Sequence, residues 1–212
     1  MCFSATASFV TSGALVVAGA GSWKLATKSE RLMALVPLLF AVQQALEGWQ
    51  WLAVHPSGMS QALGYAYLFF AFLLWPTYLP LLTYVIETEE RRRKWLRWLV
   101  VIGLCVSSSI CVALFIYPLS VSVQEGNFVY AVAVPWHLDA LGKMLYTLAT
   151  VGALLMSSRG ALVKFGLLGL ATEIAAFTVY PGGFVSVWCF LAAVSSLCIA
   201  VYLYNRSRKP II

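Results

Sequence analysis

A glutamate and three glutamines interrupt an otherwise apolar stretch of membrane length near the start of the chain. The stretch is VPLLFAVQQALEGWQWLAV, residues 36–54, and its polar members are Gln43, Gln44, Glu47 and Gln50. Spacings of three and four residues place these side chains on neighbouring rows of one helix face. An acidic residue at membrane depth is costly and usually faces a bundle interior or a wet cavity. The pattern therefore predicts a functional site at Glu47.

Further ionisable and hydroxyl side chains fall at a similar predicted depth. Asp139, Lys143 and Tyr146 recur at spacings of three and four along one predicted helix, and Glu173 lies in the outer half of the next. Lys143 is expected either to pair with Asp139 or to extend to the outer interface. The expected ligand- or ion-binding residues are Gln43, Gln44, Glu47, Lys143, Tyr146 and Glu173.

A metal or thiol-redox site is the second chemistry that these residue types allow. Cys2, Glu47, His137 and Cys189 offer thiolate, carboxylate and imidazole ligands suited to a transition metal, zinc or copper. A disulfide between Cys2 and Cys189 is a related alternative on an oxidising side of the membrane. Against a metal, the chain has two histidines and neither a CxxC nor an HExxH motif.

The composition identifies the elements that must position these residues. Of the 212 residues, 61% are hydrophobic and 10% charged, and the mean hydropathy is +0.86. Soluble domains carry about a quarter charged residues, so the chain is predicted to lie in a lipid bilayer. Its net charge of +6 comes from short clusters between apolar runs, which argues against nucleic acid as a partner.

Seven apolar runs are long enough to cross a membrane, because a hydrocarbon core about 30 Å thick takes roughly 20 helical residues. They predict an all-α membrane protein, a seven-transmembrane-helix bundle that forms a single domain over residues 1–212. The runs span residues 4–23, 32–54, 61–86, 95–116, 137–157, 160–180 and 184–204.

The distribution of basic residues predicts the orientation of this bundle. All 14 Lys and Arg residues except Lys143 lie in or beside alternate connections or the C-terminal tail, residues 205–212. Because cytoplasmic connections are enriched in Lys and Arg, we expect the N-terminus outside and the C-terminus in the cytoplasm. The expected location is the inner (plasma) membrane.

A β-hairpin is predicted on the outer side, between the fourth and fifth helices. Residues 119–134, LSVSVQEGNFVYAVAV, alternate with period two on both sides of a Gly-Asn pair. Pairing Glu125 with Phe128 would align Val123 with Tyr130 on one apolar face. Such a face is expected to cover the outer mouth of the bundle as a lid.

Four segments together resemble an uncharacterised family of bacterial integral membrane proteins that begin with MCFSATASF. The segments are MCFSATASF, PLLFAVQQALEGWQW, YLFFAFLLWPTYLPL and FVSVWCFLAAVSS, and the resemblance covers nearly the whole chain. Because no activity is established for that family, the resemblance implies that these segments form one unit and assigns no role to any residue.

The predicted function is binding or translocation of a small polar solute or ion in an outward-facing intramembrane cavity. Pro76 and Pro80 in the third helix predict a kink that either widens this site or only bends the helix. The alternatives are a membrane metalloenzyme or thiol-redox protein at the outer leaflet, and a non-catalytic bundle in which Glu47, Lys143 and Glu173 form a structural buried ion network. Enzymatic activity, the ligand and assembly into a homo-oligomer stay open.

Overall fold

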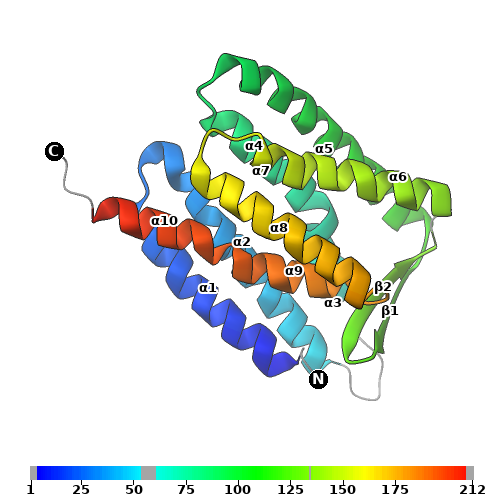
Figure 1. The fold of residues 1–212 in the computed structure, drawn as a ribbon. Coiled ribbons are helices and arrows are strands. Elements are labelled where there is room, and N and C mark those ends of the chain that lie inside the picture. The colour runs from blue at the N-terminus through cyan, green and yellow to red at the C-terminus, as the bar shows by residue number, and fades with distance from the viewer. Residues whose placement is uncertain (1–3, 54–60, 134, 209–212) are drawn as a thin grey trace.

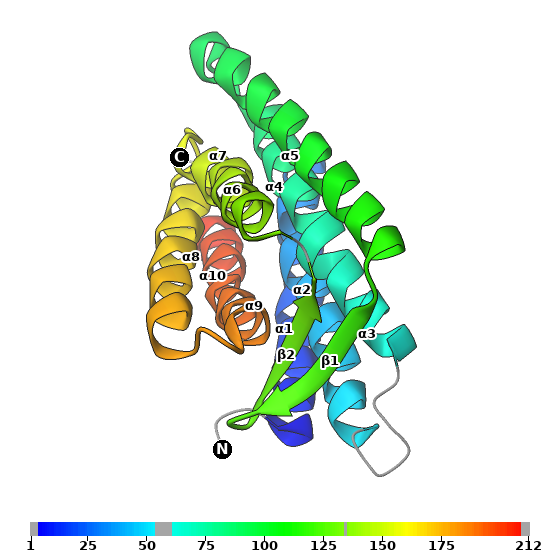
Figure 2. The same ribbon diagram turned by 90° about the vertical axis from the view of Figure 1, so that its right-hand side faces the viewer.

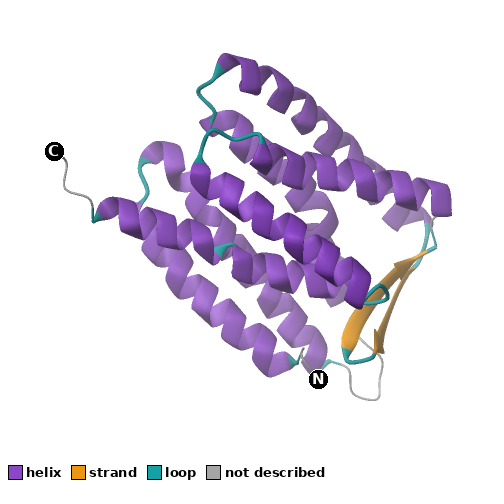
Figure 3. Ribbon diagram, in the orientation of Figure 1, coloured by secondary structure: helices purple, strands orange, loops and turns teal. Residues whose placement is uncertain are grey.

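The computed structural model describes residues 4–53, 61–133 and 135–208, and of Trp136 and His137 the backbone alone. Helices make up nearly all of this part of the chain, with one pair of strands (Figure 3). In chain order the elements are α1 (Ala5–Leu25), the 3₁₀-helix η1 (Lys28–Glu30), α2 (Arg31–Leu52), α3 (Gln61–Leu68), the π-helix η2 (Phe69–Leu74), α4 (Trp75–Ile86), α5 (Glu90–Ile116), β1 (Leu119–Gln124), β2 (Asn127–Val132), α6 (Trp136–Thr147), the π-helix η3 (Leu148–Gly152), α7 (Ala153–Leu155), α8 (Gly160–Val179), α9 (Phe184–Ser195) and α10 (Leu197–Ser207).

Seven helical spans in the described residues are long and apolar enough to cross a membrane, which confirms the predicted bundle. They are Ala5–Leu25, Lys28–Leu52, Gln61–Ile86, Glu90–Ile116, Leu138–Leu155, Gly160–Val179 and Phe184–Ser207. The fourth span begins five residues before the prediction and the seventh ends three residues after it. An apolar run marks only the part of a helix that lies in hydrocarbon, whereas Arg and Lys are good helix formers that continue it into water.

The spans pack side by side, and the hairpin lies across one end of the bundle (Figure 1). The N-terminal end of α1 is at the hairpin end, while α10 ends at the opposite side (Figure 1). Figure 2 shows the hairpin between α9 and α3, which contact β2 and β1 respectively. The main core between the helices is built from apolar side chains such as Leu15, Phe40 and Trp75.

The hairpin lies where the sequence predicts it, but the predicted register is wrong. Val123 pairs with Phe128 instead of Tyr130, so the two-residue turn is Glu125-Gly126. The backbone φ angles are 50° at Glu125 and 78° at Gly126, and two positive values are what a type I′ turn requires. That turn places glycine second, whereas the predicted Gly-Asn turn placed it first. Because Phe128 and Tyr130 are two residues apart, the same strand face is still turned to the bundle.

Two spans contain a π-helical turn, and the first of these turns directly precedes the predicted kink. Pro76 has no N–H to donate to the turn before it, and η2 is the wider turn at that point. The Ala71 carbonyl accepts the Tyr146 hydroxyl at 2.6 Å. The Leu73 carbonyl accepts the Ser107 hydroxyl at 2.9 Å. Side chains of neighbouring helices thus satisfy backbone groups that lipid could not satisfy.

At the end opposite the hairpin, Glu87 joins two turns. It is 3% exposed and accepts the backbone N–H groups of Ser158 at 2.7 Å and of Glu89 at 3.0 Å. Burial opposes ionisation, but these hydrogen bonds outweigh it and hold the pKa of the Glu87 carboxyl below its ordinary value. Arg92 donates to the Ser157 carbonyl in the same turn. The connection between α4 and α5 is therefore fixed to the connection between α7 and α8.

Gly103 allows α5 to approach the proline-containing helix, and this contact gives a stability prediction. A Cβ at position 103 would overlap the Pro76 carbonyl, whereas a Cβ at Gly13 would meet no atom within 4 Å. Overpacking a core costs about 1–3 kcal/mol, so Gly103→Ala should lower the thermal unfolding midpoint in detergent. The control Gly13→Ala should leave the midpoint unchanged or raise it, because alanine favours a helix by about 1 kcal/mol. Equal midpoints for the two variants would contradict this packing.

Candidate functional site

Glu47 is buried in the hairpin half of α2, with 1% of its surface exposed. One carboxylate oxygen accepts the Ser186 hydroxyl of α9. The other oxygen accepts Gln44 Nε2 at 3.4 Å, which is long for a hydrogen bond. The carboxylate is therefore held by neutral donors from its own helix and from α9.

Three glutamines share the buried face of α2 with Glu47, and their amides are incompletely paired. Gln43, Gln44 and Gln50 are each 0% exposed. Gln43 Oε1 accepts Trp75 Nε1 at 2.7 Å, and the indole stacks on another ring of the core. Within the described residues, Gln44 Oε1 and both polar atoms of Gln50 have no hydrogen-bond partner, and Gln43 Nε2 has only the weakly accepting sulfur of Cys189 beside it. Each such buried group costs about 1–3 kcal/mol.

Two tyrosines bring further hydroxyl groups to the cluster from α3 and from the hairpin. The rings of Tyr67 and Tyr130 stack with centroids 4.9 Å apart, and both hydroxyls interact electrostatically with Glu47 and Cys189. Burial, together with these two neighbours, raises the pKa of Tyr130 well above its ordinary value. Both hydroxyls are buried without a regular hydrogen bond in the described part of the chain, although the weakly accepting sulfur of Cys189 faces Tyr67.

The hairpin closes this cluster from the end of the bundle. The Phe128 ring of β2 packs on Trp51 at the end of α2, with ring centroids 4.3 Å apart. Gly183, just before α9, lets that helix approach the hairpin, because an added Cβ would lie 2.7 Å from the Cβ of Asn127. Glu47 and the three glutamines are at most 1% exposed, so the cluster is closed in this structure.

The expected ion network of Glu47, Lys143 and Glu173 does not form. Lys143 pairs with Asp139 at 2.7 Å, and both side chains are about half exposed, at 54% and 50%. The pairing of Lys143 along its own helix is therefore confirmed, and Lys143 is not a partner of Glu47. Among the described residues, no Lys or Arg forms an ion pair with Glu47. Neutral hydroxyl and amide groups are its neighbours instead.

Glu173 forms a second, separate polar position between α8 and α6. One oxygen accepts the Thr147 hydroxyl, and Oε2 is buried without a partner among the described residues. Tyr146 lies near Glu173 and near Cys189, which itself neighbours Glu47. The Tyr146 hydroxyl donates to the Ala71 carbonyl of η2. Tyr146 therefore has a structural role near these two polar positions.

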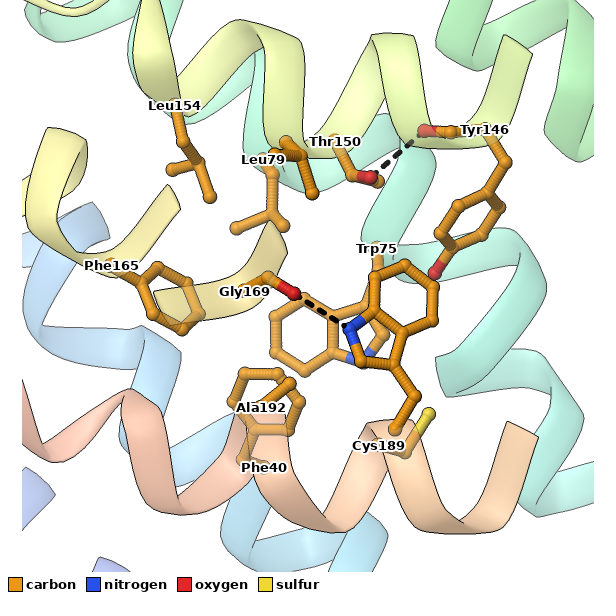
Figure 4. A pocket seen from close by; sticks show the side chains of 12 residues that line it. Phe40, Trp75, Leu79, Tyr146, Thr150, Leu154, Phe165, Gly169, Cys189 and Ala192 are labelled. Carbon is orange, nitrogen blue, oxygen red and sulfur yellow. Dashed lines mark hydrogen bonds between the residues drawn. The ribbon is translucent and has the colours of Figure 1, made fainter. Parts of the chain in front are cut away.

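A small hollow adjoins the polar cluster towards the middle of the bundle. It has a volume of about 40 Å³, which is room for a water molecule or a small ion. Figure 4 shows Trp75, Tyr146 and Cys189 around it, together with apolar side chains such as Phe40 and Leu79. Trp75 and Cys189 also contact the cluster, so they separate the hollow from Glu47.

The metal-site prediction falls partly outside the described residues. Cys2 lies outside them, and of His137 only the backbone is described. The remaining two residues, Glu47 and Cys189, do lie close together. Within the described residues no group of three or more His, Cys, Asp or Glu side chains could hold a metal ion. A zinc or copper site that uses Cys2 and His137 therefore stays a prediction.

Several residues of the cluster were not recognised as site residues from the sequence. The sequence-based expectations give no binding role to Ser186, Trp75 or Tyr67, and they place Tyr130 only on the apolar face of the hairpin. Their hydroxyl and indole groups inside apolar segments were the available signal, because buried Tyr and Trp usually find a polar partner.

Residues 1–211 match the model of a family described as a family of unknown function (DUF6629). This agrees with the resemblance to an uncharacterised family that the motif segments indicate. No curated protein and no solved structure matches the chain. The role of the Glu47 cluster must therefore be argued from its own geometry.

Two glutamates of the second span give opposite stability predictions. Glu30 is 5% exposed and pairs with Arg206 of α10, whereas Glu47 has only neutral partners. Glu47→Gln keeps an acceptor for Ser186 and should leave the thermal unfolding midpoint in detergent equal or higher. Glu30→Gln should lower it, because hydrogen bonds to charged groups are worth about 1.5–3 kcal/mol.

The same comparison tests whether Glu47 only holds helices together. Loss of folded Glu47→Gln protein, measured by size-exclusion chromatography beside the Glu30→Gln variant, would favour a purely structural role for the carboxylate. Retention of the folded protein would favour a role in binding.

Proposed function

Because the chain belongs to this family, whose function is not established, we propose from its geometry that it is a multi-pass membrane protein that binds or translocates a small polar solute or ion at the Glu47 cluster. The binding residues are Glu47, Gln43, Gln44 and Gln50, and the site opens towards the hairpin end of the bundle. Tyr146 and Glu173 lie on the far side of Cys189, where they face the next part of a path through the bundle.

One observation carries this proposal. Several buried polar atoms near the Glu47 carboxylate have no hydrogen-bond partner among the described residues. Gln50 alone contributes a donor and an acceptor, and Tyr67 and Tyr130 contribute hydroxyls. A packed polar network that only stabilised the bundle would be expected to satisfy its own members. A ligand with donors and acceptors, or an ion, would satisfy these groups when it enters.

The orientation that we propose has the hairpin and the N-terminus outside and the C-terminus in the cytoplasm of a cell with an inner (plasma) membrane. The described basic residues support it, since those around Lys28, Arg92, Arg159 and Arg206 lie at the end opposite the hairpin. Cytoplasmic ends of membrane helices carry this excess of positive charge. The hairpin then acts as an outer lid.

Opening of the site requires the hairpin to separate from α3 and α2. Two ring contacts hold it, Tyr130 on Tyr67 and Phe128 on Trp51, together with the apolar packing of Leu119. Such ring pairs are worth about 0.5–1.5 kcal/mol beyond their buried area, and burial of each large apolar side chain adds about 1.5–3 kcal/mol, so the open state is a minor population. The π-helical turns near the hollow supply flexible points for the inner half of the path, since π-helical turns recur at functional sites.

Cys189 provides a native reporter for this opening. In a variant that retains Cys189 and replaces Cys2, Cys105, Cys111 and Cys198 by alanine, an impermeant methanethiosulfonate reagent should modify the buried thiol slowly from the hairpin side. Tyr130→Ala should accelerate the modification by up to about tenfold, because each 1.4 kcal/mol changes a population tenfold. The rate is measured by mass spectrometry on sealed vesicles of known orientation.

Gln124→Cys, on the exposed edge of the hairpin, is the matched control for reagent access and should react at once. A Cys189 thiol that reacts only after denaturation, in both the parent and the Tyr130→Ala variant, would contradict an opening site.

A further inference from the structure

Among the described residues, Glu47 carries the only carboxylate of the polar cluster, and no Lys or Arg forms an ion pair with it. The ion pairs of the described residues join Lys143 to Asp139, Arg206 to Glu30 and Arg92 to Glu89. Isolated ionised groups lose several kcal/mol or more when they are taken from water into an apolar interior. A bound species that brings one positive charge would remove that cost.

The groups around the carboxylate are neutral. Ser186 donates its hydroxyl to it, Tyr67 and Tyr130 interact with it electrostatically, and Gln44 turns Nε2 towards it. The amide oxygens of Gln44 and Gln50 are buried without a partner in the described residues. Oxygen ligands of this kind suit hard cations. Cys189 is the one soft ligand that the described residues place beside them, and a single thiol does not make a site for a soft metal.

The Gln44 side chain shows how the cluster could accommodate a cation. Its Nε2 approaches Glu47 at 3.4 Å, and its Oε1 is buried without a partner in the described residues. Rotation of the amide by half a turn would exchange the two atoms, which have nearly the same size. The long donor contact would then become an oxygen that, together with the carboxylate, faces a bound ion. Gln50 lies three residues after Glu47 on α2, and both of its amide atoms are without a partner in the described residues.

We infer that the Glu47 cluster is a binding site for a monovalent metal cation, Na⁺ or K⁺, held by the Glu47 carboxylate and the amide oxygens of Gln44 and Gln50. This inference rests on the proposed function and specifies its ligand. Tyr67 and Tyr130 complete the oxygen ligands from the hairpin side, so the lid both covers and contributes to the site.

Charge and space separate this cation from other candidates. One carboxylate and a monovalent ion are neutral together, whereas a divalent ion would leave an uncompensated positive charge among buried groups. Glu47, Gln44 and Gln50 are at most 1% exposed, so a bare ion requires less displacement of packed side chains than a substituted organic amine does.

Thermal unfolding of the purified full-length protein in detergent tests the cation directly. At constant pH and ionic strength, replacement of choline chloride by NaCl or KCl should raise the unfolding midpoint along a single-site saturation curve. Glu47→Gln and Gln50→Leu should each abolish the rise. The control Asp139→Asn, at a half-exposed carboxylate that pairs with Lys143, should retain it.

Competition of unlabelled Na⁺ and K⁺ with bound ²²Na⁺ on the unmodified protein provides a second readout if a variant fails to fold. No bound ²²Na⁺ and no midpoint difference between choline and both alkali cations would overturn the inference. An unfolding midpoint that depends on pH but not on the cation would also overturn it, because a proton on Glu47 would then neutralise the carboxylate. The titratable groups that face this carboxylate are Tyr67, Tyr130 and Cys189.

These outcomes are distinguishable from failure of the proposed function. A Cys189 thiol that reacts from the hairpin side without any cation effect would leave an opening site with another ligand. A thiol that never reacts in the folded protein, combined with no cation effect, would remove both the site and its ion.

Discussion

The burial of the Glu47 carboxylate inside a membrane-length helix is the constraint on which the rest of the site depends. Water is not available at that depth to stabilise a charge, so every neighbouring element must either supply a polar group or exclude lipid. Ser186 of α9 and Gln44 of α2 supply donors, and Tyr67 and Tyr130 bring hydroxyls from α3 and the hairpin. The absence of a Lys or Arg partner among the described residues separates this arrangement from a structural ion pair. A carboxylate with neutral partners is suited to exchange a positively charged ligand, because no internal cation competes for it.

The need to satisfy polar groups away from water also shapes the backbone of the third span. Pro76 interrupts the third span, and the carbonyls before it accept hydroxyls from Tyr146 and Ser107 of neighbouring spans. These hydrogen bonds connect η2 to α6 and α5. At the opposite end, hydrogen bonds of Glu87 fix two connections to each other. The hairpin end is held by ring contacts and apolar packing instead. The opening that we propose therefore involves the hairpin end.

The sequence predicted the seven spans, the hairpin and the burial of Glu47 inside the bundle, because hydropathy and period-two alternation report directly on burial. It did not predict which polar groups meet. Lys143 lies at a depth similar to Glu47 along its helix, but depth does not determine which way a helix faces, and its side chain pairs with Asp139. Ser186 and Tyr67 were not predicted as site residues, because a single hydroxyl in an apolar run gives no spacing signal. The hairpin register shifted because Glu125 adopts a positive φ, which a sequence-based preference for glycine or asparagine would not select. Contacts between distant segments were the missing information in each case.

The ionisation state of Glu47 in the presence and absence of an alkali cation is the most direct test of the account. Infrared difference spectroscopy on the full-length protein, with Glu47→Gln to assign the bands, distinguishes the carboxylate stretch from the carbonyl stretch of the protonated acid. The account predicts that exchange of choline for Na⁺ or K⁺ converts the protonated acid of Glu47 into the carboxylate. A Glu47 band that is the same in choline, Na⁺ and K⁺ would contradict the central claim that this buried charge is balanced by a bound cation.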